Sequence, residues 1–211
     1  LRRSGSGLAA FLDGAVDGLA RAEAGLCQAA GLHIPGRDGG WNAEAVAAKF
    51  AETGWVLLEF ARRRRGLVLG ESVHGPVRRL SDLRGLRFQP RQPSSGSQLV
   101  LDRLMADEGL SADDFAMVEG CERSEIDLAQ AIAAGRADVG LGIECAARQF
   151  GLRFVPLVEE RFDLLVERRS WFEPPFQAFA RFCAGRSFRE KAAELGGYDV
   201  EDFGVVHFNG A

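Results

Sequence analysis

The segment from Arg91 to Ser97 combines residue types that suit the binding of an anion. These are Arg91, Ser94, Ser95, Gly96 and Ser97. They stand between a predicted strand and a predicted helix. The start of a helix offers free N–H groups and a positive dipole end, serine hydroxyls add donors, and a guanidinium donates two parallel hydrogen bonds. The segment therefore predicts an anion site, although a serine N-cap beside a solvated arginine gives the same pattern.

A second candidate lies at the end of the predicted strand from Ala137 to Ile143. Gly140 and Gly142 match two positions of the dinucleotide fingerprint GxGxxG, but Cys145 occupies the third, so we reject a nucleotide site. Gly142 and Ile143 are retained as ligand-binding candidates. Glycines at the carboxyl end of a strand let a ligand approach the backbone closely, at the edge where open α/β sheets bind.

The remaining reactive residue types give weaker indications. His33 ends a predicted strand and is the best placed of the three histidines, so we include it among the ligand-binding candidates. Cys145 is better explained as a small buried residue than as a reactive thiol. Glu144 begins a helix, where its charge would repel a bare oxyanion unless it points away or faces a donor on the ligand.

The sequence shows none of the motifs GxSxG, HExxH, Walker A or the kinase signature, and no histidine or cysteine stands at metal-ligand spacing. We therefore predict no catalytic residues, no metal and no cofactor. An α/β enzyme that uses His33, Cys145 or Glu144 is the least favoured alternative.

The chain alternates short apolar runs with amphipathic helical stretches, a pattern typical of βαβ units and a parallel sheet. The predicted strands are Leu26–Ile34, Trp55–Ala61, Gly66–Gly70, Leu86–Pro90, Phe115–Glu119, Ala137–Ile143, Arg153–Val158 and Phe162–Val166. The predicted helices lie within Leu8–Ala24 and at Ala43–Ala51, Gln98–Glu108, Ser124–Ala134, Glu144–Phe150, Pro175–Ala184 and Ser187–Leu195. We interpret the run Arg62–Arg65 as the solvated end of a strand, with an anion site as the alternative.

Composition excludes several classes of protein. The 211 residues are 46% hydrophobic and 27% charged, which indicates a folded globular chain, and the formal net charge of −4 offers no surplus to hold a nucleic-acid backbone. No apolar run approaches the length of a membrane span. Four scattered cysteines without a CxxC pair argue against a disulfide framework and favour a cytoplasmic location, with a periplasmic one as the alternative.

Several motifs together resemble one known family. The resemblance is centred on the stretch from Gly66 to Tyr198, where the motifs are Arg64–Gly70, Leu80–Leu83, Arg91–Ser97, Gly135–Glu144 and Leu195–Asp199. Nearer the N-terminus, the motifs are Asp13–Leu19 and Ala29–Ile34. The chain resembles the periplasmic-binding-protein-like ligand domain related to molybdate- and tungstate-binding proteins, of the type fused to helix-turn-helix transcriptional regulators. It differs at Ala15, where the family commonly has a serine, and it begins after a strand and loop that the family usually has.

The resemblance implies an α/β, two-lobed type II periplasmic-binding-protein-like fold with mixed, mainly parallel sheets. We expect lobe I at residues 1–70 plus 156–211 and lobe II at residues 71–155. The implied function is the binding of a small anion, such as molybdate or tungstate, by the effector-sensing domain of a bacterial transcriptional regulator. The alternative is the substrate-binding component of an ABC-type oxyanion transporter. We expect DNA binding only through a domain outside this chain and no membrane insertion, and a homodimer is left open.

Overall fold

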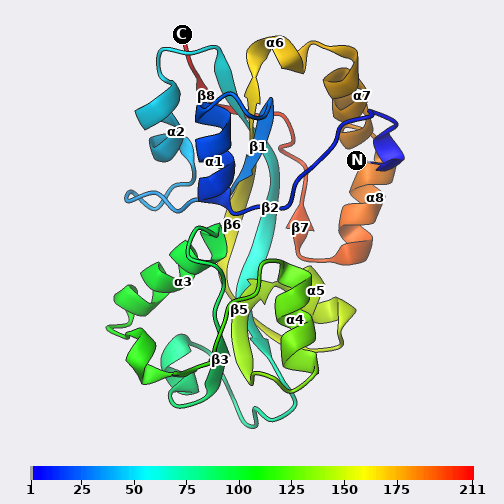
Figure 1. Ribbon diagram of the computed structural model, residues 1–211. Helices are drawn as coiled ribbons and strands as arrows, with labels where there is room; N and C mark the ends of the chain where they lie inside the picture. Colours follow the sequence, from blue (N-terminus) through cyan, green and yellow to red (C-terminus); the bar gives the residue numbers. More distant parts are fainter. Residues whose placement is uncertain (1) are drawn as a thin grey trace. The chain divides into compact units, whose positions relative to one another are not determined.

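Residues 2–211 are described by a computed structural model, which shows a mixed α/β fold (Figure 1). The chain divides into two compact units. Unit 1 comprises the residues up to Arg62 and those from Arg161 onward, and unit 2 comprises Arg63–Glu160. The chain passes between the units within two long strands, β2 and β6. The expected lobes are 1–70 plus 156–211 and 71–155. Their boundaries, after residues 70 and 155, lie eight and five residues from the boundaries of the units, which follow Arg62 and Glu160. Leu1 lies outside the described residues.

The helices and strands are described here by their labels in Figure 1. The helices are α1 Ala15–Glu23, α2 Ala43–Phe50, α3 Gly96–Asp107, α4 Glu125–Ala133, α5 Glu144–Gln149, α6 Arg168–Trp171, α7 Pro174–Cys183 and α8 Arg186–Leu195. The strands are β1 Ala29–Leu32, β2 Trp55–Leu69, β3 Arg87–Gln89, β4 Ala116–Met117, β5 Val139–Ile143, β6 Arg153–Glu167, β7 Tyr198–Asp199 and β8 Val206–Asn209. Short 3-10 turns cover Arg2–Ser4, Leu80–Leu83 and Ala112–Asp114.

The strands form a mixed sheet in the order β1-β6-β2-β5-β3-β4, and β7 and β8 pair with β2. Strand β3 pairs in parallel with β4 and β5, whereas β2 is antiparallel to β5 and β8, and β1 is antiparallel to β6. The α/β class and the mixed sheet are therefore confirmed, but the expectation of mainly parallel sheets is wrong, because three of these five pairs are antiparallel. Parallel pairing is concentrated in unit 2, because only there do short strands alternate regularly with helices.

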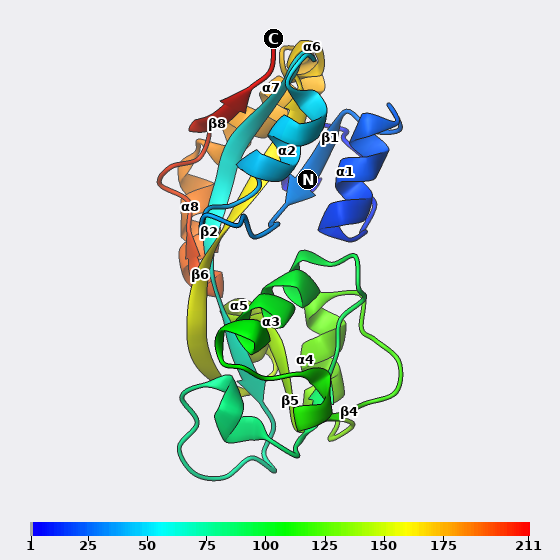
Figure 2. The same cartoon turned by 90° about the vertical axis from the view of Figure 1, so that its left-hand side faces the viewer.

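Unit 1 has helices on both sides of its strands, with α1 and α2 on one side and α7 and α8 on the other (Figures 1 and 2). Neighbouring residues of β2 point to opposite faces, so Leu57 joins a core with Leu19, Val46 and Phe50, while Leu58 packs with Phe176. The alternation of apolar side chains along β2 thus builds two layers of core from one strand.

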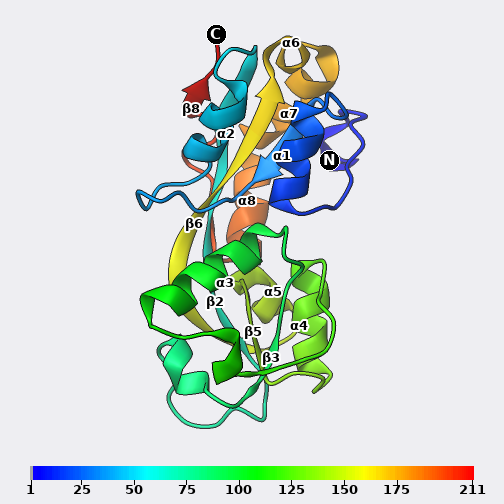
Figure 3. The ribbon, with the colours of Figure 1, turned by 60° about the vertical axis from the view of Figure 1, so that its left-hand side comes forward.

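Unit 2 places α3 and α4 on opposite sides of β5 (Figure 3). Its core includes Val68 of β2, Leu128 and Ile132 of α4, and Ala147 of α5. Every residue of β5 is buried, as expected for a strand covered on both faces. This packing fixes the first turns of α3 and α4 near the carboxyl ends of β3 and β5.

The interpretation of Arg62–Arg65 as a solvated strand end is wrong. These residues continue one strand of 15 residues, and Arg65 has no exposed surface. Likewise, the predicted strands Arg153–Val158 and Phe162–Val166 are one strand, β6. A strand continues through charged residues when each buried charge finds a partner, which local sequence does not reveal.

Strands β2 and β6 approach each other closely at Gly66. A Cβ at this position would stand 2.0 Å from the carbonyl oxygen of Val155 and 2.8 Å from the Cα of Pro156. Both neighbours are backbone atoms, so a rotamer change cannot relieve the contact. Glycine is therefore required at residue 66 by the spacing of two strands.

We predict that Gly66→Ala lowers the free energy of unfolding by about 3 kcal/mol, because the backbone of β6 must move. Urea denaturation measures this change. Gly54→Ala is the control, since a Cβ there meets nothing within 4 Å and the residue does not have positive φ, and it should change stability by at most about 0.5 kcal/mol. Equal stability of the two variants would contradict the close approach.

Candidate functional site

Two predicted ligand-binding segments lie at the same edge of the sheet in unit 2. Strand β3 runs parallel to β5, with Gln89 opposite Gly140. The loop after β3 and the residues Gly142 and Ile143, which end β5, therefore both stand at carboxyl ends of adjacent parallel strands. This is the edge at which open α/β sheets bind their ligands.

Arg91 holds the loop together. Its Nε donates to the carbonyl oxygen of Glu122 at 3.0 Å, and its Nη2 donates to that of Arg123, also at 3.0 Å. Its Nη1 lies 2.9 Å from Oε1 of Glu125. The side chain is only 7% exposed, so in this structure Arg91 joins the loop after β3 to the segment before α4.

The first turn of α3 offers backbone donors. Ser95 is the N-cap, and its Oγ accepts a hydrogen bond from the N–H of Gln98 at 3.1 Å. The next two residues, Gly96 and Ser97, are buried, and within residues 2–211 their N–H groups have no acceptor. The first N–H groups of a helix have no partner within the helix, so they are available to another acceptor. With the helix dipole, they make this turn suitable for an anion.

Glu125, the first residue of α4, lies at the centre of the site. Its Oε1 accepts from the hydroxyl of Ser97 at 2.9 Å and from Nη2 of Arg65 at 2.9 Å, in addition to its contact with Arg91. Its Oε2 lies 3.6 Å from the position that a Cβ on Gly142 would occupy. One carboxylate thus connects the start of α3, the loop after β3 and the end of β5.

Arg65 of β2 is the buried partner of this carboxylate. Its Nε and Nη2 donate to the two carboxylate oxygens of Glu160 at 2.6 and 3.1 Å. Arg63, two residues earlier on the same face of β2, also forms an ion pair with Glu160. Two carboxylates from β6 and α4 therefore surround the Arg65 guanidinium.

This environment determines the protonation of Glu125. Burial raises the pKa of its carboxyl group. The positive charges of Arg65, Arg91 and Arg63 lower this pKa by more than burial raises it, so the pKa lies well below the usual 4.5. Glu125 is ionised at neutral pH and accepts hydrogen bonds without donating any.

The structure brings Arg91, Ser97 and Gly142 together around Glu125, and Ser95 and Gly96 lie in the adjoining turn. Ser94 is half-buried and accepts a hydrogen bond from Nε2 of Gln92 at 3.4 Å. Ile143 pairs with Arg65 across β5 and β2. His33 belongs to unit 1, where its ring lies 5.9 Å from that of Phe162.

Sequence reasoning missed Arg65, Glu125 and Glu160. Position along the strand could have indicated Arg65: in a continuous strand Arg63 and Arg65 share one face. Ser124 before Glu125 is a recognisable N-cap, but nothing local shows that this carboxylate turns toward Arg65. Glu144, expected to point away from an anion or to face a donor, pairs with Arg64 at 2.7 Å.

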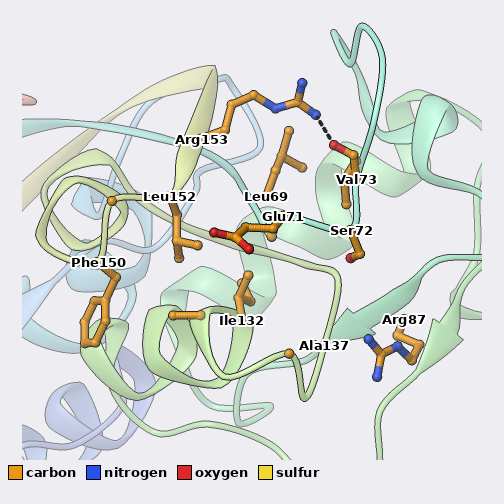
Figure 4. Close-up of a pocket in the computed structure, with 14 residues that line it drawn as sticks. Leu69, Glu71, Ser72, Val73, Arg87, Ile132, Ala137, Phe150, Leu152 and Arg153 are labelled. Carbon is orange, nitrogen blue, oxygen red and sulfur yellow. Dashed lines mark hydrogen bonds between the residues drawn. The ribbon is translucent and has the colours of Figure 1, made fainter.

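A separate pocket of about 430 Å³ opens at the other end of the unit 2 strands (Figure 4). Leu69, Ile132 and Leu152 supply apolar lining, and the carboxylate of Glu71 lies among them. Arg153 donates to the carbonyl oxygen of Val73 at 3.0 Å. None of the predicted ligand-binding residues lines this pocket.

Within residues 2–211, no group of three or more His, Cys, Asp and Glu side chains is arranged to hold a metal ion. None of the helices in these residues has the length and apolar character needed to cross a bilayer.

Comparison with known proteins identifies the family. The model of the PBP superfamily domain, named for periplasmic binding proteins, matches residues 1–184. The chain belongs to this superfamily. Its members bind small ligands, and the structure has their type II fold.

Among curated relatives, the uncharacterised protein YvgK of Bacillus subtilis (strain 168) is 23% identical over 185 residues, which are 86% of this chain and 59% of YvgK. The chain thus spans about three fifths of that relative. A putative phosphate ABC transporter substrate-binding protein with bound phosphate, from Clostridium perfringens, has a TM-score of 0.62 at 12% identity and covers 91% of this chain and 85% of its own.

The regulatory domain of CcmR from Synechocystis PCC6803, in complex with 2-PG, has a TM-score of 0.59 at 13% identity, covering 80% of this chain and 77% of its own. At such identities these structures show that the PBP fold is shared. They include both a transporter component and a regulatory domain.

We predict that Glu125→Ala destabilises the protein by about 3–5 kcal/mol, because Arg65 and Arg91 lose the carboxylate that both contact. Glu119→Ala is the control, since Glu119 is exposed and surface substitutions change stability by about 0.5 kcal/mol or less. Urea denaturation of both variants provides the measurement. A loss below about 1 kcal/mol in Glu125→Ala would show that water solvates the arginines equally well.

The lowered pKa of Glu125 also predicts the pH dependence of stability. The stabilisation from its ionised form is complete above the unfolded-state pKa, near the usual 4.5, and is lost as pH falls through the lower folded-state pKa. Between about pH 5 and about pH 2, wild-type stability should therefore fall more steeply than that of Glu125→Gln, which has no carboxyl group to protonate. Urea denaturation across this range tests it, and parallel curves would contradict the assigned shift.

Proposed function

We propose that this PBP domain binds a small oxyanion at the first turn of α3, and that it does so as the effector-sensing domain of a bacterial transcriptional regulator. The observation that carries the proposal is that Gly96 and Ser97, two buried residues at the start of α3, have N–H groups without an acceptor among the described residues. An oxyanion supplies acceptors for both groups and is stabilised by the helix dipole. Arg91, Ser94, Ser95, Gly142 and Ile143 surround this turn in the proposal.

Binding would act by a shift of population. A sensing domain responds when the ligand has a higher affinity for one conformation than for another. In a regulator that shift would be passed to a DNA-binding domain, and no chemical step is required. Molybdate and tungstate, which the sequence resemblance implies, are tetrahedral oxyanions of a size that two adjacent N–H groups can hold.

The second candidate function is the substrate-binding component of an ABC-type oxyanion transporter. It is favoured by the likeness to the Clostridium perfringens protein, whose structure contains phosphate. The coding sequence upstream of this chain distinguishes the two roles. A helix-turn-helix there supports the regulator, and a signal peptide supports the transporter.

The proposed site is tested by removing one N–H group. Gly96 is the first helical residue, a position that accepts proline, and the ψ of 140° at Ser95 suits a residue before proline. We predict that Gly96→Pro keeps the fold but weakens oxyanion binding about tenfold or more, as expected for the loss of a charge-assisted hydrogen bond.

Isothermal titration calorimetry with phosphate, sulfate, molybdate and tungstate measures the binding, and circular dichroism checks the fold. Gly96→Ala is the matched control, since it adds a methyl group but retains the N–H. If the wild-type protein binds none of the four anions, the proposed function is wrong. If Gly96→Pro binds as tightly as Gly96→Ala, the anion is held elsewhere.

A further inference from the structure

The pocket beside Leu69 and Leu152 is a cavity of unit 2 that the proposed anion site does not use. Its volume of about 430 Å³ lies within the range of about 300–1,000 Å³ that is usual for small-molecule sites. Leu69 and Ile132 are buried and form part of its apolar lining, and the half-buried side chains of Phe150 and Leu152 extend it. Such a lining favours a ligand with an apolar part.

Two strands bring opposite charges to this pocket. Gly66 of β2 lies against Val155 and Pro156 of β6, so the last residues of β2 and the first residues of β6 are close together. Glu71 follows the end of β2, Arg153 is the first residue of β6, and both line the pocket (Figure 4). A carboxylate and a guanidinium from distant parts of the sequence therefore share one cavity.

Three charged side chains line the pocket, and only one of them has a counter-ion among residues 2–211. Arg87 donates to both carboxylate oxygens of Asp138, at 3.1 and 2.8 Å. Arg153 donates to two backbone carbonyl oxygens at 2.9 and 3.0 Å, which carry no net charge, and no carboxylate of these residues lies within ion-pair distance of it. Glu71 likewise has no cationic partner in this part of the chain. One negative and one positive charge thus remain for a ligand.

These two charges define the chemistry of the ligand. A carboxylate accepts from an ammonium group, and a guanidinium, with five N–H groups of which Arg153 uses two, can still donate to a carboxylate. Helix α4 ends at Ala133, which also lines the pocket, and the C-terminal end of a helix favours a cation. A simple anion or cation would pair with one of the charges and be repelled by the other. A zwitterion satisfies both.

We infer that this pocket is a second ligand site of the domain and binds an amino acid with an aliphatic side chain. The ammonium group donates to the carboxylate of Glu71, the ligand carboxylate accepts from Arg153, and the aliphatic side chain covers Leu69 and Ile132. None of the residues proposed to hold the oxyanion lines this pocket. The inference is therefore independent of the proposed function.

Isothermal titration calorimetry with L-leucine tests the site. We expect the wild-type protein to bind leucine with a Kd of about 1 mM or tighter. Glu71→Gln and Arg153→Gln should each weaken binding about tenfold or more, as expected for the loss of a charge-assisted hydrogen bond. Both side chains are exposed, and circular dichroism checks that the variants fold.

The matched controls are Glu119→Gln and Arg189→Gln. Each removes the same charge from an exposed residue that does not line the pocket, so the affinity for leucine should stay within about twofold of the wild-type value. They separate a contact with the ligand from the effect of a changed net charge.

Two analogues of leucine assign each charge to its partner. Isoamylamine lacks the carboxylate, isocaproate lacks the ammonium group, and each should bind the wild-type protein about tenfold or more weakly than leucine. In Arg153→Gln, leucine and isoamylamine should bind within about threefold of each other, because the partner of the carboxylate is gone. In Glu71→Gln the same should hold for leucine and isocaproate.

The outcomes distinguish this site from the anion site. If the wild-type protein binds no leucine, the inference is wrong, whatever the anion titrations show. Leucine binding that neither Glu71→Gln nor Arg153→Gln weakens also overturns it, because the ligand is then held elsewhere. Gly96→Pro should bind leucine like the wild type, and a loss of leucine binding in this variant would place the amino acid at the proposed anion site instead.

Discussion

The guanidinium of Arg65 is buried completely in unit 2, and the surrounding structure must neutralise it. A buried charge is tolerated only when opposite charges and hydrogen bonds replace the water it has lost. Glu160 of β6 and Glu125 of α4 supply them, with contacts at 2.6 and 2.9 Å. Because these carboxylates come from different elements, one cation contacts both the strand β6 and the helix α4 from its position on β2.

The same requirement arranges the proposed binding edge. Once Glu125 turns toward Arg65, its Oε1 is also in reach of Ser97 and Arg91, and these contacts fix the first turn of α3 and the loop after β3. The donors that the sequence offered as ligands are thus partly used to build the site. What is left for the proposed ligand is the backbone N–H of Gly96 and Ser97. An ionised carboxylate and the proposed anion site can therefore share one edge of the sheet.

The two ends of the unit 2 strands differ in character. At the carboxyl ends, helices begin and place N–H groups and charges toward one another. At the opposite end, the pocket beside Leu69 and Leu152 combines apolar lining with the charged side chains of Glu71, Arg87 and Arg153, and no helix of the unit begins in it. The type II fold is shared with solved structures at 12 and 13% identity, so its architecture does not depend on the particular charges of this chain.

The sequence by itself determined the class of fold and the elements that carry the proposed site. Apolar runs alternating with helical stretches predicted the strands and helices of unit 2, and the serine-rich turn before α3 predicted helix-terminal donors, because these signals are local. It did not reveal that Arg62–Arg65 continue the strand β2. It also did not reveal that the guanidinium of Arg91 pairs with the carboxylate of Glu125. Those features depend on which charges from β2, β6 and α4 meet in space. The cost of burying a charge is offset by an opposite charge that is far away in the sequence, and only the tertiary structure decides which charges meet.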